Sequence, residues 1–339
     1  MSLYVTADQI GSPSGGGLVT CHESEALKSL GPCDVWGRAD LECQGEEPWK
    51  WDTRATQKLA FKKVDLCHAY AGTFSAMIKL IKENSGKVSY TAAAHNIELS
   101  RQAHEAVGLS FNHQHLTDHK LWKRYVAGYL AADVVICPSQ HSAGVMREYG
   151  CKNVVVIPHG VDVPAIPAPL PLRFAVGYMG SWGADKSVVT LLKAWKKLKY
   201  KDVALIFAGR DSTSPWAAHL ISTYGGGGPI QLLGWVQNIS DFYNMISLYV
   251  QPSVSEGFGI EVLEAMAHGR NVICSSGAGA ADVLPDCCKF PAGDVDRLTD
   301  MIDNAKRNGA FHRFHENAKH YTWDKIRARY IDVWKGLLT

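Results

Sequence analysis

The sequence predicts an α/β protein with two domains, each built around a parallel sheet. Short β-branched runs alternate with longer segments of helical periodicity, which is the pattern of β-α-β units. The chain has 339 residues, more than the roughly 100 to 200 that are usual for one domain. The segment 161–171 contains four closely spaced prolines, which exclude a regular helix or an inner strand. We interpret this segment as the linker between the domains.

Apolar runs mark the expected strands in chain order. In the first half they cover residues 3–7, 64–69, 87–94, 134–137 and 154–157. In the second half they cover residues 174–179, 203–208, 230–233, 248–251 and 271–274, interleaved with helices such as 188–198. Apolar residues at helical spacing over 323–338 predict a closing amphipathic helix. The expected domains are therefore 1–163 and 164–322, with a C-terminal helix over 323–339 that packs back on the first domain.

Composition and charge are those of an ordinary folded protein. Hydrophobic residues make up 46% and charged residues 20% of the chain, and a net charge of +2 provides no overall basic field for nucleic acid. Nine cysteines without a C-x-x-C pair fit neither a disulfide framework nor a zinc ribbon. The first strand begins too early for a secretory leader, and no apolar run is long enough to span a membrane. We therefore expect reduced thiols and a cytoplasmic location.

The most informative segment is 252–269, P-S-V-S-E-G-F-G-I-E-V-L-E-A-M-A-H-G, which follows an expected buried strand and begins a helix. Ligands of open α/β sheets bind at such carboxyl ends of strands. Gly257 and Gly259 allow a tight turn and a close approach of the main chain to a ligand. The free amides at the helix start supply hydrogen-bond donors and a partial positive charge. These features suit an anion with the shape of a diphosphate.

The block E-G-F-G-I-E-V-L-E-A-M-A-H-G-R at 256–270 resembles the E-x7-E segment of the family 4 retaining glycosyltransferases, in the glycogen synthase-like glycosyl transferase group 1. Further similarities occur in the order that this family requires. They are Gly15-Gly16-Gly17, His95, A-D-V-V-I-C-P-S at 132–139, P-H-G-V-D at 158–162, G-S-W-G-A-D-K-S at 180–187, A-G-R-D at 208–211, G-W-V at 234–236 and Y-T-W-D at 321–324. The resemblance is weakest between residues 33 and 85. It implies the GT-B fold, in which two Rossmann-like domains face each other across a cleft, and the linker implies closure about a hinge.

The resemblance implies roles for residues of the second domain. Glu256 would contact hydroxyls of the donor sugar near the reacting carbon, and Glu264 would hold the ribose. Lys186 would neutralise the diphosphate leaving group. Main-chain groups that would hold sugar, phosphate or base belong to Gly257, Phe258, Gly259, Ile260, Trp235 and Val236. Outside the roles implied by the motif, a glutamate such as Glu261 is expected to be a solvated helix residue.

The expected site also includes residues of the first domain, and at one position the sequence differs from the family pattern. By the resemblance, His95 would lie near the donor sugar, and Gly16 and Gly17 would approach the phosphates or the acceptor. Where such enzymes usually carry an arginine five residues before the lysine, this sequence has Ser181. Arg210 follows an expected strand at the same carboxyl edge and is the candidate substitute for a bidentate phosphate contact.

The implied activity is transfer of a sugar from a UDP- or GDP-linked donor to a hydroxyl acceptor, such as a glycan, a glycolipid or a small molecule. The resemblance implies retention of the anomeric configuration. Lys186 and the amides of the helix start would meet the charge that develops on the diphosphate, so we expect neither a divalent metal nor another cofactor. The expected partners are the nucleotide-sugar donor and the acceptor, and no nucleic acid.

Three other hypotheses compete with transfer. A sugar-nucleotide epimerase of the same architecture would change the sugar nucleotide without an acceptor. A non-catalytic sugar-nucleotide-binding protein is favoured only by the departure at Ser181. A nicotinamide dehydrogenase is disfavoured because the run of glycines at 15–17 lacks the G-x-G-x-x-G spacing.

Two further groups of residues bear on metal and membrane binding. His113, His115 and His119 have no suitably spaced cysteine or carboxylate partner, so no metal site is expected there. Lysines form a basic helical face at positions 193, 196, 197, 199 and 201. This face is a candidate for peripheral contact with anionic lipid, and a solvated face is the favoured alternative.

Overall fold

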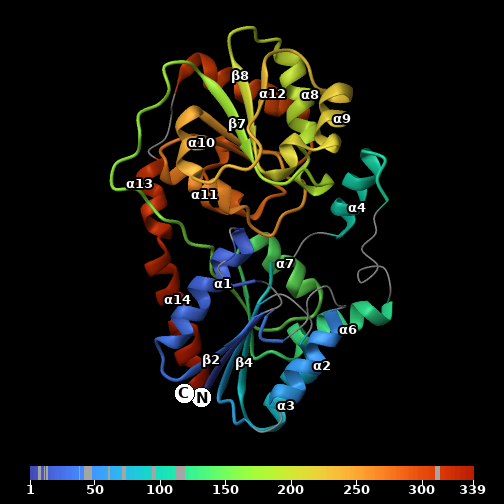
Figure 1. Cartoon of the computed structure of the whole chain (residues 1–339), viewed down its shortest axis with the longest axis vertical. Coiled ribbons are helices and arrows are strands. Elements are labelled where there is room, and N and C mark those ends of the chain that lie inside the picture. Colours follow the sequence, from blue (N-terminus) through green and yellow to red (C-terminus); the bar gives the residue numbers. More distant parts are fainter. Residues whose placement is uncertain are drawn as a thin grey trace. The chain divides into compact units, whose positions relative to one another are not determined.

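The computed structural model of the chain divides into two compact units (Figure 1). Unit 1 comprises Met1–Ala94, Asn112–Gly160 and Trp323–Thr339, and unit 2 comprises His95–Phe111 and Val161–Thr322. The structure describes residues 1–6, 9–10, 12, 14–37, 39–41, 48–59, 62–70, 74–93, 97–110, 119–309 and 314–339. One segment departs from the expected division, because 95–111 groups with unit 2 although it lies within the expected first domain.

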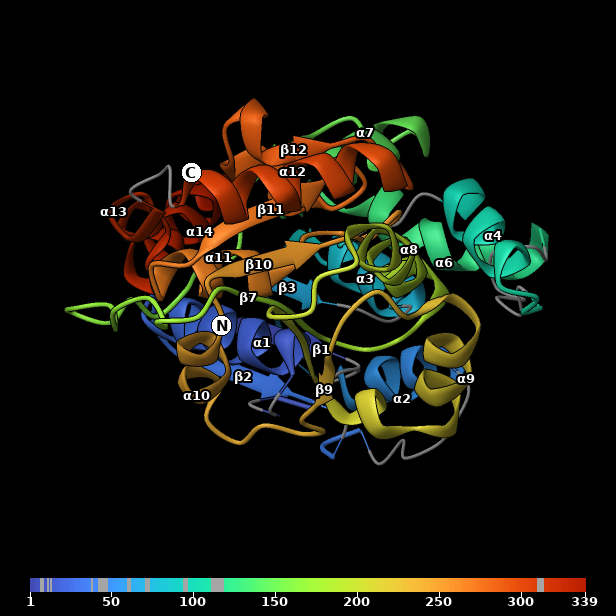
Figure 2. The same cartoon turned by 90° about the horizontal axis from the view of Figure 1, so that it is seen from above.

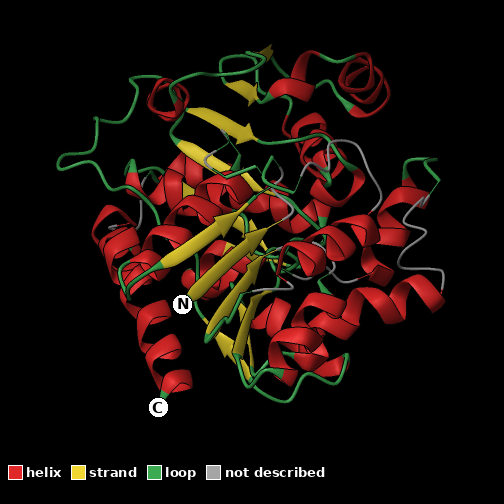
Figure 3. Ribbon diagram, turned by 60° about the horizontal axis from the view of Figure 1, so that its bottom comes forward, coloured by secondary structure: helices red, strands yellow, loops and turns green. Residues whose placement is uncertain are grey.

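Unit 1 contains a six-stranded sheet in the order β2-β1-β3-β4-β5-β6, and all of its pairs are parallel. The strands are β1 (Ser2–Thr6), β2 (Cys33–Trp36), β3 (Leu66–Tyr70), β4 (Lys87–Thr91), β5 (Val134–Cys137) and β6 (Val154–Val156). The helices are α1 (Gly15–Lys28), α2 (Pro48–Leu59), α3 (Ser75–Glu83), α6 (His119–Ala131), α7 (Gln140–Glu148) and the C-terminal α14 (Trp323–Leu338). Figure 3 shows strands of this sheet between helices. The inner strands are buried along their length, as apolar strands covered on both faces should be.

A buried polar cluster joins α14 and α1 to the sheet of unit 1, where the two helices lie side by side (Figure 1). The Glu23 carboxylate on α1 accepts hydrogen bonds from the Tyr4 hydroxyl at 2.8 Å and the Thr91 hydroxyl at 2.9 Å. His68 Nε2 lies 3.3 Å from the same carboxylate. Burial by itself raises the pKa of Glu23, but the charge and hydrogen bonds of His68 and Tyr4 outweigh burial and hold this pKa below its ordinary value.

We expect Glu23→Ala to lower the free energy of unfolding by about 3 kcal/mol, because it leaves buried donors without their acceptor. Glu25→Ala on the same helix should cost under about 1 kcal/mol, since Glu25 is exposed and its ion pair with Arg327 is a surface pair. Because the folded-state pKa of Glu23 is depressed, its stabilisation is present above the pKa of the unfolded chain and is lost as pH falls through the folded-state pKa. Urea unfolding of both variants at several pH values checks this expectation. Equal losses for the two variants would contradict it.

Unit 2 contains a second six-stranded parallel sheet, in the order β12-β11-β10-β7-β8-β9. The strands are β7 (Ala175–Met179), β8 (Ala204–Ala208), β9 (Ile230–Leu232), β10 (Leu248–Gln251), β11 (Asn271–Ser275) and β12 (Lys289–Phe290). β10 and β11 run side by side in Figure 2. The strand order reverses between β7 and β10, which makes the carboxyl ends of these two strands the topological switch point where such sheets bind ligands.

Unit 2 also contains α-helices. They are α4 (Ile97–Ala106), α8 (Val188–Leu198), α9 (Pro215–Tyr224), α10 (Ile239–Met245), α11 (Ile260–Ala267), α12 (Val295–Asn308) and α13 (Phe314–Ala318). α8 matches the expected helix residue for residue, and its buried face packs beside α12. The proline-rich linker is held to this unit by the fully buried Arg270, which donates hydrogen bonds to the carbonyls of Ala168 and Pro169.

Two strands were missing from the sequence prediction. β2 has the sequence C-D-V-W and β12 has only Lys289 and Phe290, and each is an edge strand. β2 is only partly buried and contains Asp34, and β12 has only two residues, so neither forms the continuous apolar run that marks an inner parallel strand.

Candidate functional site

Two loops at the switch point of unit 2 carry the charged residues that the sequence singled out. The segment after β7 contains Lys186, and the segment after β10 contains Glu256. The two segments are tied together by the Val254 N–H, which donates to the Asp185 carbonyl at 2.8 Å. Sequence-distant residues are therefore brought to one place by the strand order of the sheet.

Lys186 ends a short 3-10 helix, η1 (Ala184–Lys186), that interrupts the path from β7 to α8. The chain reaches η1 through Gly180, whose φ of +151° suits glycine, and leaves it through Ser187 at a φ of +47°. This path turns the Lys186 side chain to Glu256, and the ammonium group donates a hydrogen bond to Glu256 Oε1.

Glu256 is buried, with 6% of its surface exposed, and its second carboxylate oxygen is also fully engaged. Oε2 accepts hydrogen bonds from Gln251 Nε2 at 2.6 Å and from the Ser253 hydroxyl at 2.7 Å. The Tyr249 hydroxyl in turn donates to Gln251 Oε1 at 2.6 Å, which fixes the orientation of that amide. A buried carboxylate with an ion pair and two further hydrogen-bond donors is held in one position.

The charge of Lys186 is maintained by its neighbours. Burial of the ammonium group lowers its pKa, but Glu256 and then Glu261 raise it by more, so that the pKa of Lys186 lies above its ordinary value. The site therefore presents a cation at neutral pH beside the carboxyl ends of β7 and β10.

The start of α11 follows directly after this pair. Gly259 precedes the helix with a φ of +95° and provides no side-chain cap, so the first amides of α11 depend on other groups. A Cβ atom at Gly259 would also approach Glu256 Oε2 to 3.3 Å. The loop is fixed from the other side, because the Ala280 N–H donates to the Phe258 carbonyl at 2.7 Å. Gly257, Phe258, Gly259 and Ile260 are all buried.

Glu264 lies one turn into α11 and is half-buried. The Tyr243 hydroxyl on α10 donates to Glu264 Oε2 at 2.9 Å. Burial, followed by the nearby charge of Glu261, raises the pKa of Glu264 from 4.5 to about 7. The carboxyl group is therefore poised to change its charge near neutral pH.

We expect the raised pKa of Glu264 to appear in the stability of the ligand-free protein. As pH rises from 4.5 to about 7, the unfolded chain ionises this group before the folded protein does, so stability falls across that window. Glu264→Gln should remove this pH-dependent loss, which amounts to roughly 2 kcal/mol in the free energy of unfolding. The stability of the variant should therefore increase relative to that of the wild type between pH 5 and pH 8. Melting temperatures at several pH values measure the difference. Glu316 forms an exposed surface pair with Lys319, so the melting temperature of Glu316→Gln should follow that of the wild type at every pH. An equal increase in the melting temperature of both variants would contradict the raised pKa of Glu264.

The structure corrects the expectation that Glu261 is a solvated helix residue. Glu261 is half-buried in the first turn of α11, one helical turn before Glu264 on the same face. Burial is the main cause that raises the pKa of the Glu261 carboxyl, and the charge of Glu256 adds to it while that of Lys186 opposes it. The helical pattern placed Glu261 on α11 but did not reveal which groups pack against it.

Arg210 and Trp235 form a second pair at the carboxyl edge of the sheet. Arg210 Cζ lies 4.6 Å from the centroid of the Trp235 ring, and both side chains are exposed. The loops that carry them are joined by the Gly209 N–H, which donates to the Gly234 carbonyl at 2.8 Å. The described contact of Arg210 is thus with Trp235 and not with the Lys186–Glu256 pair.

The remaining expected site residues are dispersed. Ser181 is exposed, and its carbonyl accepts from the Tyr178 hydroxyl at 2.6 Å. Val236 is half-buried beside the core of unit 2. Gly16 and Gly17 lie in the first turn of α1 in unit 1, where a Cβ at Gly17 would collide with the main chain of Ser12. His95 lies outside the described residues.

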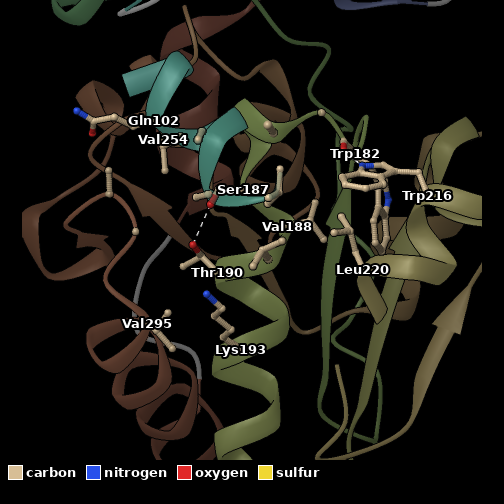
Figure 4. Close-up of a pocket in the computed structure, with 18 residues that line it drawn as sticks. Gln102, Trp182, Ser187, Val188, Thr190, Lys193, Trp216, Leu220, Val254 and Val295 are labelled. Atoms are coloured by element: carbon tan, nitrogen blue, oxygen red, sulfur yellow. Dashed lines mark hydrogen bonds between the residues drawn. The ribbon is translucent and has the colours of Figure 1, made fainter. Parts of the chain in front are cut away.

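A pocket of about 310 Å³ lies near the Lys186 segment without containing its charged residues (Figure 4). Residues of α8 line one side of it, among them Val188, Thr190 and Lys193. Trp182, Trp216 and Leu220 line another side. Neither Lys186 nor any of the three glutamates borders it, so we do not include this pocket in the candidate site.

The described part of the chain contains neither a metal-binding cluster nor a membrane-spanning helix. No group of three or more His, Cys, Asp or Glu side chains there could hold a metal ion, and His113 and His115 lie outside it. Among the described helices none is long and apolar enough to cross a membrane. The five lysines at 193–201 are exposed, and Lys197 pairs with Asp296 on α12.

Sequence reasoning missed the residues that hold the two motif glutamates. Gln251 and Ser253 orient Glu256, and Tyr243 bonds Glu264. Gln251 is a polar residue at the end of a buried strand, and this was the one signal in the sequence that could have revealed its role. Tyr243 comes from another helix, and only the packing of α10 on α11 brings it to the site.

Comparison with known families identifies the class of protein. Residues 173–308 match the model described as Glycosyl transferases group 1, and residues 40–164 match the model described as Glycosyltransferase Family 4. The chain belongs to the family 4 glycosyltransferases.

Two curated relatives illustrate the similarity in sequence. O-antigen chain mannosyltransferase B of Escherichia coli is 27% identical over 174 residues, which are 47% of this chain and 45% of that protein. Phosphatidyl-myo-inositol mannosyltransferase of Mycolicibacterium smegmatis is 29% identical over 207 residues, which are 54% of this chain and 52% of that protein. The matches thus span about half the length of these relatives.

Solved structures share the fold over nearly the whole chain. Sucrose-phosphate synthase of Thermosynechococcus elongatus has a TM-score of 0.77 at 17% identity, with 99% of this chain and 98% of that chain covered. HepE of Anabaena, in complex with UDP and glucose, has a TM-score of 0.71 at 17% identity, with 99% and 100% covered. These similarities confirm the expected fold class of two Rossmann-like domains, the GT-B fold.

Proposed function

We propose that this protein transfers a sugar from a UDP- or GDP-linked diphosphosugar to a hydroxyl acceptor, with retention of anomeric configuration and without a divalent metal. The observation that carries the proposal is the buried Lys186–Glu256 pair beside the start of α11, at the switch point of the sheet in unit 2. A fixed cation, a fixed carboxylate and a helix start are the groups that a diphosphosugar requires.

The reaction breaks the bond between the anomeric carbon and the diphosphate oxygen and forms a bond from that carbon to the acceptor oxygen. Negative charge develops on the departing diphosphate, where Lys186 and the first amides of α11 stabilise it. Positive charge develops on the sugar, near which Glu256 accepts hydrogen bonds from hydroxyls. The acceptor attacks from the face that the diphosphate leaves, and a diphosphate oxygen takes the acceptor proton.

The other expected residues bind the donor. Glu264, oriented by Tyr243, accepts hydrogen bonds from the ribose hydroxyls. The exposed Trp235 and the neighbouring Val236 frame the base. The proposal includes both UDP- and GDP-linked donors. HepE, which has the same fold, is a complex with UDP. The expected contacts to the base depend on main-chain groups and on shape, and such contacts do not distinguish the two bases. The names of the two relatives suggest glycan or lipid-linked acceptors for this chain as well.

A metal ion is not part of the proposed mechanism. The one D-x-D sequence, Asp294-Val295-Asp296, begins α12, where Asp294 caps the helix by accepting from the Arg297 N–H at 2.9 Å. Asp296 pairs with Lys197 on the surface of unit 2. Membership of a transferase family favours transfer over epimerisation or binding without catalysis.

Binding of the donor can be tested by thermal shift with UDP-, GDP- and ADP-sugars in the presence of EDTA. We expect one nucleotide series to raise the melting temperature of the wild type, because ligand binding stabilises the folded state by mass action. Glu264→Ala should lose most of that rise, since it loses the ribose contact.

The matched control is Glu316→Ala, which removes an exposed carboxylate from the same unit. This variant should respond like the wild type. A wild type that responds to no nucleotide sugar would refute the proposal, and a response that requires added magnesium would refute its metal independence.

A further inference from the structure

α4 packs on the segment that carries Lys186. It comes from the first half of the sequence, but it belongs to unit 2, where it contacts η1. Gln102 of α4 lines the pocket of Figure 4 together with Ser187, which follows η1, and Val254, which follows β10. α4 therefore borders the same space as the two loops of the candidate site.

The Asp185 carboxylate is the group that joins η1 to α4. The buried Ser100 hydroxyl donates a hydrogen bond to Asp185 Oδ1. His104 Nδ1 lies 2.8 Å from the Ser100 carbonyl and 3.9 Å from the same Oδ1. Because a carbonyl only accepts hydrogen bonds, Nδ1 carries a proton and donates it to Ser100. The next turn of α4 thus places an imidazole beside the carboxylate, and the Asp185 side chain is only 26% exposed.

η1 has little support of its own. It is a single 3-10 turn of three residues, with poorer hydrogen-bond geometry than an α-helix. It ends at Ser187 with a φ of +47°, a conformation that costs a non-glycine residue about 1 to 2 kcal/mol.

Contacts with other elements must therefore hold η1 in place. Among the described residues, three hydrogen bonds tie η1 to other elements. One is the bond from Lys186 to Glu256. Asp185 accepts the other two, at its carbonyl from the Val254 N–H and at its carboxylate from Ser100. Two of the three ties thus pass through the residue next to Lys186.

We propose that Asp185 is a positioning residue for Lys186 and that α4 holds it in place through Ser100. The carbonyl and the carboxylate of Asp185 fix the turn of η1, and this turn sets where the adjacent ammonium group lies. Asp185 acts through Lys186 and not on the donor itself. The inference rests on the proposed function, because that function gives Lys186 its role at the departing diphosphate.

Steady-state release of nucleoside diphosphate from UDP- and GDP-sugars in EDTA is the first test. A shift of about 1 Å in a catalytic group can cost about 10²-fold in rate, and Glu256 still holds Lys186, so Asp185→Ala and Ser100→Ala should each lower kcat about ten-fold. KM for the donor should stay within about three-fold, because Lys186 meets charge that develops in the transition state.

Two further variants accompany this measurement. Asp185→Asn should keep kcat within about three-fold of the wild type, since its amide oxygen still accepts from Ser100. Glu105→Ala is the matched control on α4, where it removes an exposed carboxylate that pairs with Arg101. It should change kcat by less than about two-fold, because such surface pairs contribute little.

The Lys186→Met background separates positioning from loss of folded protein. Asp185→Ala added to Lys186→Met should lower the rate by less than about two-fold, because the group that Asp185 positions is already absent. General damage to the fold would lower the rate by the same factor in both backgrounds. Ser100→Ala combined with Asp185→Ala should be no slower than the slower single variant, since both substitutions remove the same hydrogen bond.

Hydrogen exchange tests the contact without any substrate. A hydrogen bond to a charged group contributes about 1.5 to 3 kcal/mol. In Asp185→Ala the amides of α4 should therefore exchange at least about ten-fold faster than in the wild type, while those of α8 stay within about two-fold.

The results distinguish failure of the inference from failure of the proposed function. Wild-type kcat in Asp185→Ala, or an equal loss in both Lys186 backgrounds, would overturn the inference. A wild type that releases nucleoside diphosphate from no donor would refute the proposed function instead. Hydrogen exchange would then decide whether Asp185 holds α4. Faster exchange confined to α4 would support this contact, and unchanged exchange would overturn it.

Discussion

Lys186→Met is expected to lower kcat/KM for the nucleotide sugar by about 10² to 10³-fold, the effect of removing one preorganised group from a charge-developing site. Methionine approximates the length and packing of the lysine stem but carries no charge. In the wild type the ammonium group is held by Glu256 and remains cationic despite its burial. Without it, the departing diphosphate meets only amides, and Glu256 becomes a buried carboxylate without its counter-charge.

The control for this substitution is Lys193→Met on α8, an exposed lysine whose ammonium group lies 5.1 Å from the centroid of the Tyr224 ring. It should change kcat/KM by less than about two-fold, because an exposed cation remote from the reacting groups is screened by solvent. Initial rates of nucleoside diphosphate release measure both variants. If Lys186→Met retained activity within about three-fold of the wild type, the role of Lys186 in leaving-group stabilisation would be wrong.

Glu256→Gln is the second large effect, with an expected fall in kcat of about 10² to 10³-fold. The carboxylate accepts from Lys186, Gln251 and Ser253, and an amide in its place turns one acceptor atom into a donor. Its interaction with the sugar should strengthen as positive charge develops in the transition state. The loss should therefore fall mainly on kcat, while donor affinity stays within about ten-fold.

Ser253→Ala is the matched control, because it removes one hydrogen bond to the same carboxylate and leaves its charge in place. We expect a loss of at most about ten-fold, in line with one neutral-donor bond. The double variant Lys186→Met with Glu256→Gln should be far less impaired than the product of the single effects, since the two groups form one buried unit. Multiplicative losses would show instead that the two side chains act independently.

The inner parts of the fold could be predicted because buried parallel strands appear as continuous apolar runs. Thus β5 and β10 were predicted residue for residue, whereas the edge strands β2 and β12 were not. The register and order of strands are tertiary properties. They place the end of β7 beside the end of β10 and so bring Lys186 to Glu256.

Within the site, the sequence predicted residues that belong to a local motif and missed those that arrive from other elements. Glu256 and Glu264 are recognisable by their spacing around the glycine turn. The Tyr243 hydroxyl on α10 donates a hydrogen bond to Glu264, and no local sequence pattern predicts this contact. Glu261 was expected in solvent because helical periodicity gives the direction of a side chain and not its neighbours. The stacking of Arg210 on Trp235 likewise depends on two separate loops.

The central claim is that Lys186, Glu256 and the start of α11 bind and activate a nucleotide diphosphosugar. The most direct test is to incubate the purified protein with UDP- and GDP-sugars in EDTA and to quantify the released nucleoside diphosphate, for the wild type and for Lys186→Met. We predict release from one nucleotide series by the wild type, and a rate about 10² to 10³-fold lower for the variant. Release no faster than in buffer for every donor, or equal release by the two proteins, would contradict the claim.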